Sequence, residues 1–242
     1  MLRINGDGVD LRSISRYPLT HDEEDPRIYD SLHGELEKAR SNLKAFISAV
    51  GAKKVEWADG NHEWRILRSF EKEDKALRII GLRNVKSAIS TPALLDFKSL
   101  GVDEYLGSYP TGDWLHPRLE PHANVWVEHG YRVSKKSGYT VSNLVSDRMA
   151  SCIVNHCEKL SGPAWTRALG RDYFGIENGN LSVIGEPGPG DGLYGGVPHS
   201  EPRYMNHRQG FSVVYYESGQ WHPYCIKIRD GRAVFNGKLY RA

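Results

Sequence analysis

Hydrophobic and polar positions predict two consecutive strand-turn-helix segments at the start of the chain. Residues 2–5 form a short run of strand character before a glycine turn, and apolar residues then recur every three or four positions over residues 32–50, which is typical of a helix with one apolar face. Residues 53–57 alternate as a second strand, and residues 64–77 have a helical spacing. The pattern predicts an α/β fold.

Further strands are predicted at residues 124–128 and 151–155. After residue 181 the pattern changes to short β runs broken by glycine and proline. The runs at residues 213–216, 224–228 and 233–235 predict an antiparallel meander with tight turns between its strands. Since 242 residues lie within the range of one α/β domain, we expect a single domain over residues 1–242.

Charge and cysteine content limit the possible partners. The 32 basic and 30 acidic residues nearly cancel, so no overall field attracts nucleic acid, and a site for a polyanion must be local. This balance argues against a nucleic-acid partner. The three cysteines form no CxxC pair, no apolar stretch has the length of a membrane span, and the N-terminus has no signal-peptide pattern. We therefore expect a cytoplasmic protein without a membrane partner.

Four predicted strand ends carry side chains that can bind a metal: Asp7, Asn61, His129 and His156. One carboxylate, one amide oxygen and two imidazoles form a mixed oxygen and nitrogen set, which suits manganese, iron or zinc better than calcium. Manganese is our first expectation. Two plainer interpretations stay open: Asn61 could cap the helix that begins near His62, and the two histidines could be buried structural residues.

Four stretches resemble the motifs of calcineurin-like metallophosphoesterases. Residues 6–10, Gly-Asp-Gly-Val-Asp, resemble the GDxxD motif, and residues 60–63, Gly-Asn-His-Glu, resemble the GNHE motif. Residues 125–130 resemble the strand and His-Gly turn of the family, and residues 153–158 resemble a degraded GHxH motif. The tail is similar to phage-encoded members, so the resemblance covers nearly the whole chain.

The resemblance implies a two-sheet sandwich flanked by helices and an active site with named roles. Asp7 matches the aspartate that bridges two metals, and Asn61, His129 and His156 match the other ligands of one metal. His62 matches the catalytic histidine that assists the leaving oxygen. Asp10 either acts beside it by orienting the bridging region or only ends a turn, and the same two roles are open for Glu63. Arg65 and Arg132 could contact phosphate oxygens or be ordinary surface arginines.

Departures from the family pattern all fall on the second metal. Only six residues precede Asp7, which leaves no room for the N-terminal DxH motif, and Glu158 stands where the last histidine of GHxH is expected. We expect one well-held ion and a second that is weak or absent, with Glu158 as a candidate oxygen ligand. An upstream translation start would be a simpler cause. A missing first strand predicts a gap in one sheet, covered by another segment or by a second chain as a homo-oligomer.

These features predict a metal-dependent phosphoester hydrolase that acts through metal-activated water. A phosphodiester needs less charge neutralisation than a monoester, so we expect a phosphodiesterase acting on small cyclic nucleotides such as 2′,3′-cyclic nucleotides, in the host cytoplasm for a phage-encoded chain. The alternatives are a catalytically impaired, metal-stabilised protein that binds phosphate or nucleotide, and a nuclease.

Overall fold

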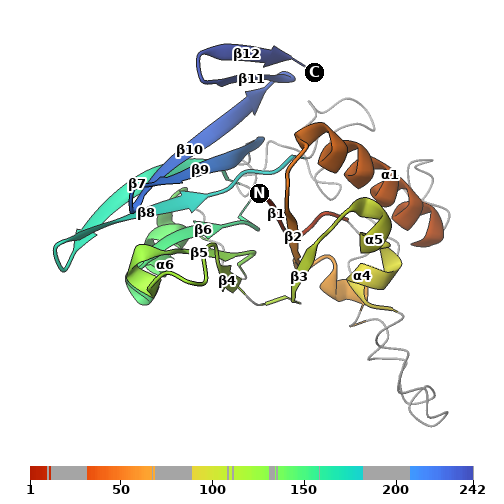
Figure 1. Ribbon diagram of the computed structural model, residues 1–242, viewed down its shortest axis with the longest axis horizontal. Coiled ribbons are helices and arrows are strands. Elements are labelled where there is room, and N and C mark those ends of the chain that lie inside the picture. Colours follow the sequence, from red (N-terminus) through yellow and green to blue (C-terminus); the bar gives the residue numbers. More distant parts are fainter. Residues whose placement is uncertain are drawn as a thin grey trace, which may run out of the picture. The chain divides into compact units, whose positions relative to one another are not determined.

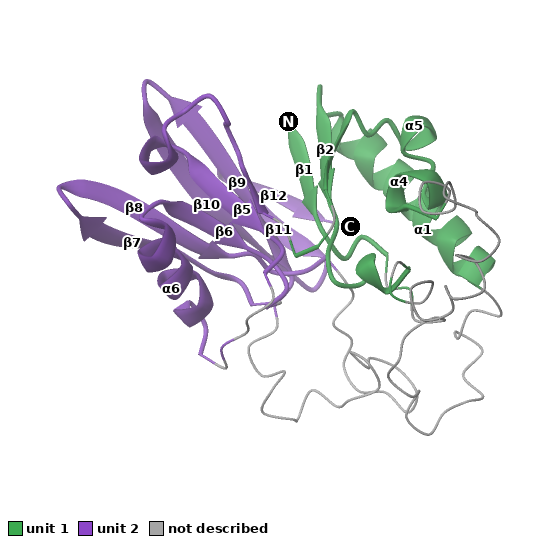
Figure 2. Ribbon diagram, turned by 90° about the horizontal axis from the view of Figure 1, so that it is seen from below, with its two compact units in different colours: residues 1–111 green, residues 112–242 purple. Residues whose placement is uncertain are grey.

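The computed structural model describes residues 1–9, 11, 32–66, 68, 89–107, 109–110, 112–130, 134, 136–157, 159–181 and 208–241. The chain divides into two compact units, unit 1 with residues 1–111 and unit 2 with residues 112–242 (Figure 2). Each unit has its own hydrophobic core and combines helices with a sheet, which confirms the predicted α/β class. The single domain over residues 1–242 stays a prediction.

Unit 1 is built on a three-stranded parallel sheet. Its strands β1 (Leu2–Asn5), β2 (Val55–Ala58) and β3 (Glu104–Gly107) lie in the order β1-β2-β3, and Asn5 pairs with Ala58 at the carboxyl ends of the first two. The two predicted strands are confirmed. All four residues of β2 are buried, so β2 is the central strand by burial as well as by pairing.

Three helices cover one face of this sheet: α1 (Leu32–Val50), α4 (Thr91–Leu94) and α5 (Phe97–Leu100) (Figure 1). The predicted periodicity of α1 is confirmed, because Leu36, Leu43 and Ile47 are its buried hydrophobic residues and join the core around Trp57. Of the helix predicted at residues 64–77, residues 64–66 and 68 are helical, and the remainder lies outside the described residues.

Unit 2 contains a five-stranded mixed sheet. Its strands follow the order β4 (Gly112–Trp114), β5 (Val125–Glu128), β6 (Ser151–Val154), β8 (Arg171–Glu177) and β7 (Ser161–Ala168). The three inner strands are parallel, and the two outer strands are antiparallel to their neighbours. A 3-10 helix (Pro121–Ala123) precedes β5, and helix α6 (Tyr139–Arg148) lies between β5 and β6 in the chain. The predicted strands at residues 124–128 and 151–155 are confirmed.

A four-stranded antiparallel meander ends unit 2 (Figure 1). It consists of β9 (Gly210–Glu217), β10 (Gln220–Arg229), β11 (Arg232–Phe235) and β12 (Lys238–Arg241). The predicted meander is confirmed, with longer strands and with β12 added. Trp221 packs against the core around Phe174 of the five-stranded sheet. Among the described helices of both units, none has the length and apolar character needed to cross a membrane.

Candidate metal centre

Asp7 lies in the turn that directly follows β1. Its backbone φ is 53°, in the left-handed region that aspartate tolerates better than most residues. The side chain is partly buried. This turn places a carboxylate at the carboxyl end of a parallel strand, the edge where α/β folds commonly bind ligands.

The turn after β2 brings His62 to Asp7. The backbone N–H of His62 donates to Asp7 Oδ1 at 3.0 Å, and His62 Nε2 lies 3.8 Å from Asp7 Oδ2. Because β1 and β2 are parallel neighbours in register, their following turns leave the same edge of the sheet. Asn61 lies in this second turn and is partly buried. Unit 1 therefore brings predicted site residues from two motifs together, and we call them the unit 1 half-site: Asp7, Asn61 and His62.

Glu63 joins the two turns of the unit 1 half-site. Its buried carboxylate accepts backbone N–H groups of Asp7 at 2.9 Å, Gly8 at 2.7 Å and Val9 at 3.3 Å from one turn, and of Gly60 at 2.8 Å from the other. Burial, with added repulsion from Asp7 and Asp59, raises the pKa of Glu63 to about 7. Of the two roles that the sequence left open for Glu63, these four hydrogen bonds match the orienting one.

Asp59 fixes the start of the second turn. Its buried carboxylate accepts hydrogen bonds from Trp57 Nε1 at 3.1 Å, Thr91 Oγ1 at 3.0 Å and the Tyr105 hydroxyl at 2.6 Å. Burial raises the pKa of Asp59, although these hydrogen bonds act in the opposite direction. Asp59 thus ties the turn to β2, β3 and α4 through neutral donors.

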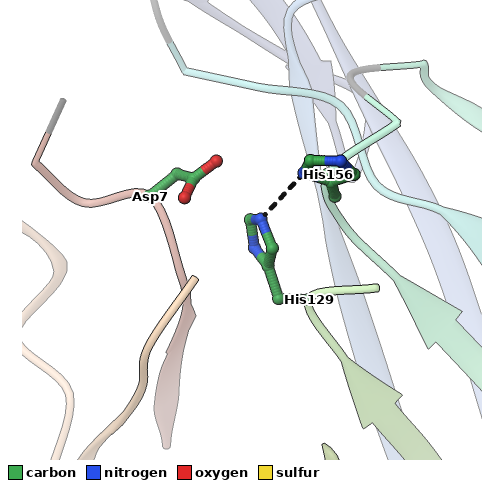
Figure 3. Close-up of side chains that lie close together, drawn as sticks. All are labelled: Asp7, His129 and His156. Carbon is green, nitrogen blue, oxygen red and sulfur yellow. Dashed lines mark hydrogen bonds between the residues drawn. The ribbon is translucent and has the colours of Figure 1, made fainter. Parts of the chain in front are cut away.

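Unit 2 brings His129 and His156 together in the same way. His129 follows β5 and His156 follows β6, and these strands are parallel neighbours with Glu128 paired to Val154. His129 is buried, and its Nε2 lies 3.2 Å from His156 Nδ1 (Figure 3). His156 has a left-handed φ of 62°. We call these two residues the unit 2 half-site.

The imidazole geometry fits a shared metal ion. Two nitrogens bound to one ion at about 2.1 Å, with an angle between 90° and the tetrahedral value, lie roughly 3.0–3.4 Å apart. The observed separation of 3.2 Å falls within this interval. The unit 1 half-site separately offers a carboxylate and an amide oxygen, which are also metal-ligand types. The same separation also fits a hydrogen bond between neutral imidazoles.

The end of the loop after His129 is fixed by Glu177, which the sequence interpretation did not single out. Glu177 is fully buried and accepts the backbone N–H of Gly138 at 2.6 Å and of Thr140 at 3.1 Å, at the start of α6. Lys159, also buried, donates to the backbone carbonyl of Ser134 in the same loop. Glu177 ends β8, a strand that the sequence interpretation did not predict, so no pattern pointed to this residue.

Of the remaining predicted site residues, Arg65 alone lies among the described residues. Arg65 lies in the helical turn after His62, where its backbone N–H donates to the His62 carbonyl at 3.0 Å, and its side chain is partly buried. Asp10, Arg132 and Glu158 lie outside the described residues, so their roles stay predictions.

No protein-family model matches this sequence, and neither a curated protein nor a solved structure is significantly similar to it. Its function is therefore inferred from the two half-sites.

Proposed function

We propose that the chain is a metal-dependent phosphoester hydrolase, a phosphodiesterase acting on small cyclic nucleotides such as 2′,3′-cyclic nucleotides. One divalent cation, Mn²⁺ first and Fe or Zn next, would be held by Asp7, Asn61, His129 and His156, so that it joins the two half-sites. The observation that supports this proposal is the repeated geometry: in each unit, two adjacent parallel strands end in turns that meet, Asp7 with His62 in unit 1 and His129 with His156 in unit 2.

The roles of the chain's own groups follow from their positions. A bound cation supplies Lewis acidity and lowers the pKa of a water toward ~7. His62, 3.8 Å from the Asp7 carboxylate, would give a proton from its imidazole to the leaving oxygen. Arg65 and Arg132 would contact phosphate oxygens, Asp10 would orient the Asp7 turn, and Glu158 would weakly hold a second ion.

The proposal includes the finer fold, a two-sheet metallophosphoesterase-like sandwich flanked by helices. Within unit 1, β1 is the edge strand of the described sheet, with β2 as its neighbour. Its outer edge is where a further strand would add. The parallel pairs β1-β2 and β5-β6 supply the strand ends that the family motifs require.

Metal analysis of ligand variants tests whether the two half-sites share one ion. We expect about one Mn²⁺ per chain after loading and gel filtration, and loss of that ion in both Asp7→Asn and His156→Ala. Matched controls are Asp172→Asn and His33→Ala, whose side chains are 62% and 77% exposed and which should keep the ion. If Asp7→Asn keeps all its metal while His156→Ala loses it, the shared ion is ruled out.

Measuring substrate turnover distinguishes a hydrolase from a protein that only binds its ligand. The rival is a protein that binds a phosphoryl ligand without cleaving it, in which the ion only holds strand ends together. The loaded protein should hydrolyse 2′,3′-cyclic AMP and bis(p-nitrophenyl) phosphate. Calorimetric binding of the nucleotide with no hydrolysis under Mn²⁺, Fe²⁺ or Zn²⁺ would establish the rival instead. Preferential cleavage of oligonucleotides would identify a nuclease.

A further inference from the structure

Three arginines form a row across the outer strands of the meander. The pairing register places Arg229 of β10 opposite Arg232 of β11, and Arg232 opposite Arg241 of β12. Directly paired residues of antiparallel strands project from the same face, with Cβ atoms about 4.5–5.5 Å apart. Like charges in this arrangement repel one another. The row therefore lowers the stability of the hairpin that carries it.

The arginine row has little compensation from acidic groups. All three residues are exposed. Arg229 Nε lies 3.6 Å from Asp230 Oδ2, but both side chains are more than 80% exposed, where an ion pair contributes little. In the described part of the chain, the side chains of Arg232 and Arg241 make no hydrogen bond or ion pair. An anion bound along the row would remove the repulsion.

The positive charge is concentrated in this region. Residues 208–241 contain six Lys or Arg and two Asp or Glu, a net charge of +4, whereas the whole chain has +2. The nearly neutral total therefore conceals a local basic surface. Three strands span two interstrand spacings of about 4.8 Å, so the row is roughly 10 Å long. That length exceeds one phosphate group and suits a chain of phosphates.

Exposed aromatic rings accompany the arginines. Tyr215, Tyr224 and Phe235 form a cluster on the other face of the meander, with ring centroids 5.8–6.4 Å apart. Tyr240 follows on β12, whose four residues are all exposed, next to Arg241 in sequence. The outer strand thus presents a guanidinium on one face and an aromatic ring on the other. Because β12 is the edge strand of the meander, a flexible nucleic-acid strand that passes over this edge can contact the arginines on one face and Tyr240 on the other. Cations together with exposed rings bind single-stranded nucleic acid, because bases stack on the rings.

We propose that the meander β9–β12 binds single-stranded nucleic acid, with successive phosphates along Arg229, Arg232 and Arg241 and a base stacked on Tyr240. The hairpin β11-β12 continues from the end of β10, away from α6 and β4 of the same unit (Figure 1). This binding does not depend on the metal half-sites, so it can be tested independently of the proposed hydrolase activity.

Fluorescence anisotropy with a fluorescein-labelled dT20 oligonucleotide tests this surface in the full-length chain, with EDTA present so that metal-dependent cleavage does not contribute. The double variant Arg232→Gln/Arg241→Gln should raise Kd at least tenfold and reduce the salt-dependence slope by about 1.4, since each lost phosphate contact removes about 0.7. Tyr240→Leu should raise Kd about fivefold or more. The matched control Arg167→Gln/Arg171→Gln removes two exposed arginines from the β7-β8 hairpin and should change Kd less than twofold.

Thermal unfolding supplies a second readout. Because the arginine row is repulsive, Arg232→Gln/Arg241→Gln should unfold at the same or a higher temperature, so lost binding cannot be ascribed to lost folding. The proposal is overturned by no binding of dT20 at micromolar protein, by equal losses in the control, or by concentration-dependent dimerisation that masks the row. It is also overturned if anionic phosphatidylserine vesicles bind through Val234 and Leu239, exposed aliphatic residues paired beside the row, while dT20 does not.

Discussion

The backbone N–H of His62 donates to Asp7 Oδ1 across 55 positions of sequence, at 3.0 Å. One carboxylate oxygen of Asp7 is therefore held by a main-chain group, which fixes the orientation of the carboxylate without using the His62 side chain. The imidazole of His62 lies nearby but forms a longer contact, 3.8 Å. Backbone and side chain of His62 thus have separable roles.

His62→Ala tests that separation. The backbone donor to Asp7 remains in this variant, so we expect its metal content to match that of the parent protein. Loss of the imidazole should lower kcat on an activated diester by about 10²–10⁴-fold, because general acid catalysis contributes that much. Unchanged turnover, measured beside His33→Ala, would remove the assigned role of His62.

Glu63→Gln should destabilise unit 1. The amide keeps one acceptor oxygen, so two of the four backbone N–H groups that Glu63 now satisfies would face its NH₂ group. Each buried donor left without an acceptor costs about 1–3 kcal/mol, so the two donors predict a loss of about 2–6 kcal/mol in the free energy of unfolding. Urea titration measures it. Glu37→Gln, on the exposed face of α1, should stay within about 0.5 kcal/mol.

Gly130→Ala should cost more than Gly170→Ala, although both glycines have positive φ, 82° and 75°. A left-handed alanine costs about 1–2 kcal/mol at either position. At Gly130 the new Cβ would also lie 2.8 Å from Val154 Cγ2, whereas at Gly170 nothing lies within 4 Å. Overpacking adds about 1–3 kcal/mol. Equal losses in urea titrations would show that the loop beside His129 adjusts without strain.

Glu56 should make the protein less stable in acid. Burial alone would raise the pKa of Glu56, but hydrogen bonds from Lys54 at 2.7 Å and Arg3 at 2.8 Å outweigh it and hold the pKa below its ordinary value of 4.5. Its contribution to stability is therefore present above pH 4.5 and lost as pH falls through the lowered pKa. In Glu56→Gln the free energy of unfolding, measured by urea titration at several pH values, should decrease less as pH falls below 4.5. The same pH dependence in the variant and the parent protein would contradict this role of Glu56.

Sequence periodicity predicted the elements whose burial is regular. In α1 the apolar residues recur with the helix period, and β2 and β6 are buried along their whole length. The sequence did not reveal α6, because Val141, Leu144 and Val145 give it only a short apolar stripe and a distant carboxylate, Glu177, binds the N–H groups at its start. The exposed strand β7 begins with Ser161, Gly162 and Pro163, which read as a loop.

The candidate site could be predicted only in part, because some of its contacts leave no pattern in the sequence. The pairs Asp7 with His62 and His129 with His156 follow from the rule that parallel strands end at one edge of a sheet. The contacts of Glu63 involve backbone N–H groups of two turns, and no pattern of side chains along the chain specifies them. Turn geometry therefore had to come from the structure.

Trp57 and Gly8 are expected to vary together in evolution. The indole of Trp57 lies so close under Gly8 that a Cβ at position 8 would overlap it, while Trp57 Nε1 donates to Asp59. Only a smaller residue at position 57 would leave room for a side chain at position 8. Homologues that lose the tryptophan should therefore be the ones that tolerate alanine or serine after the aspartate.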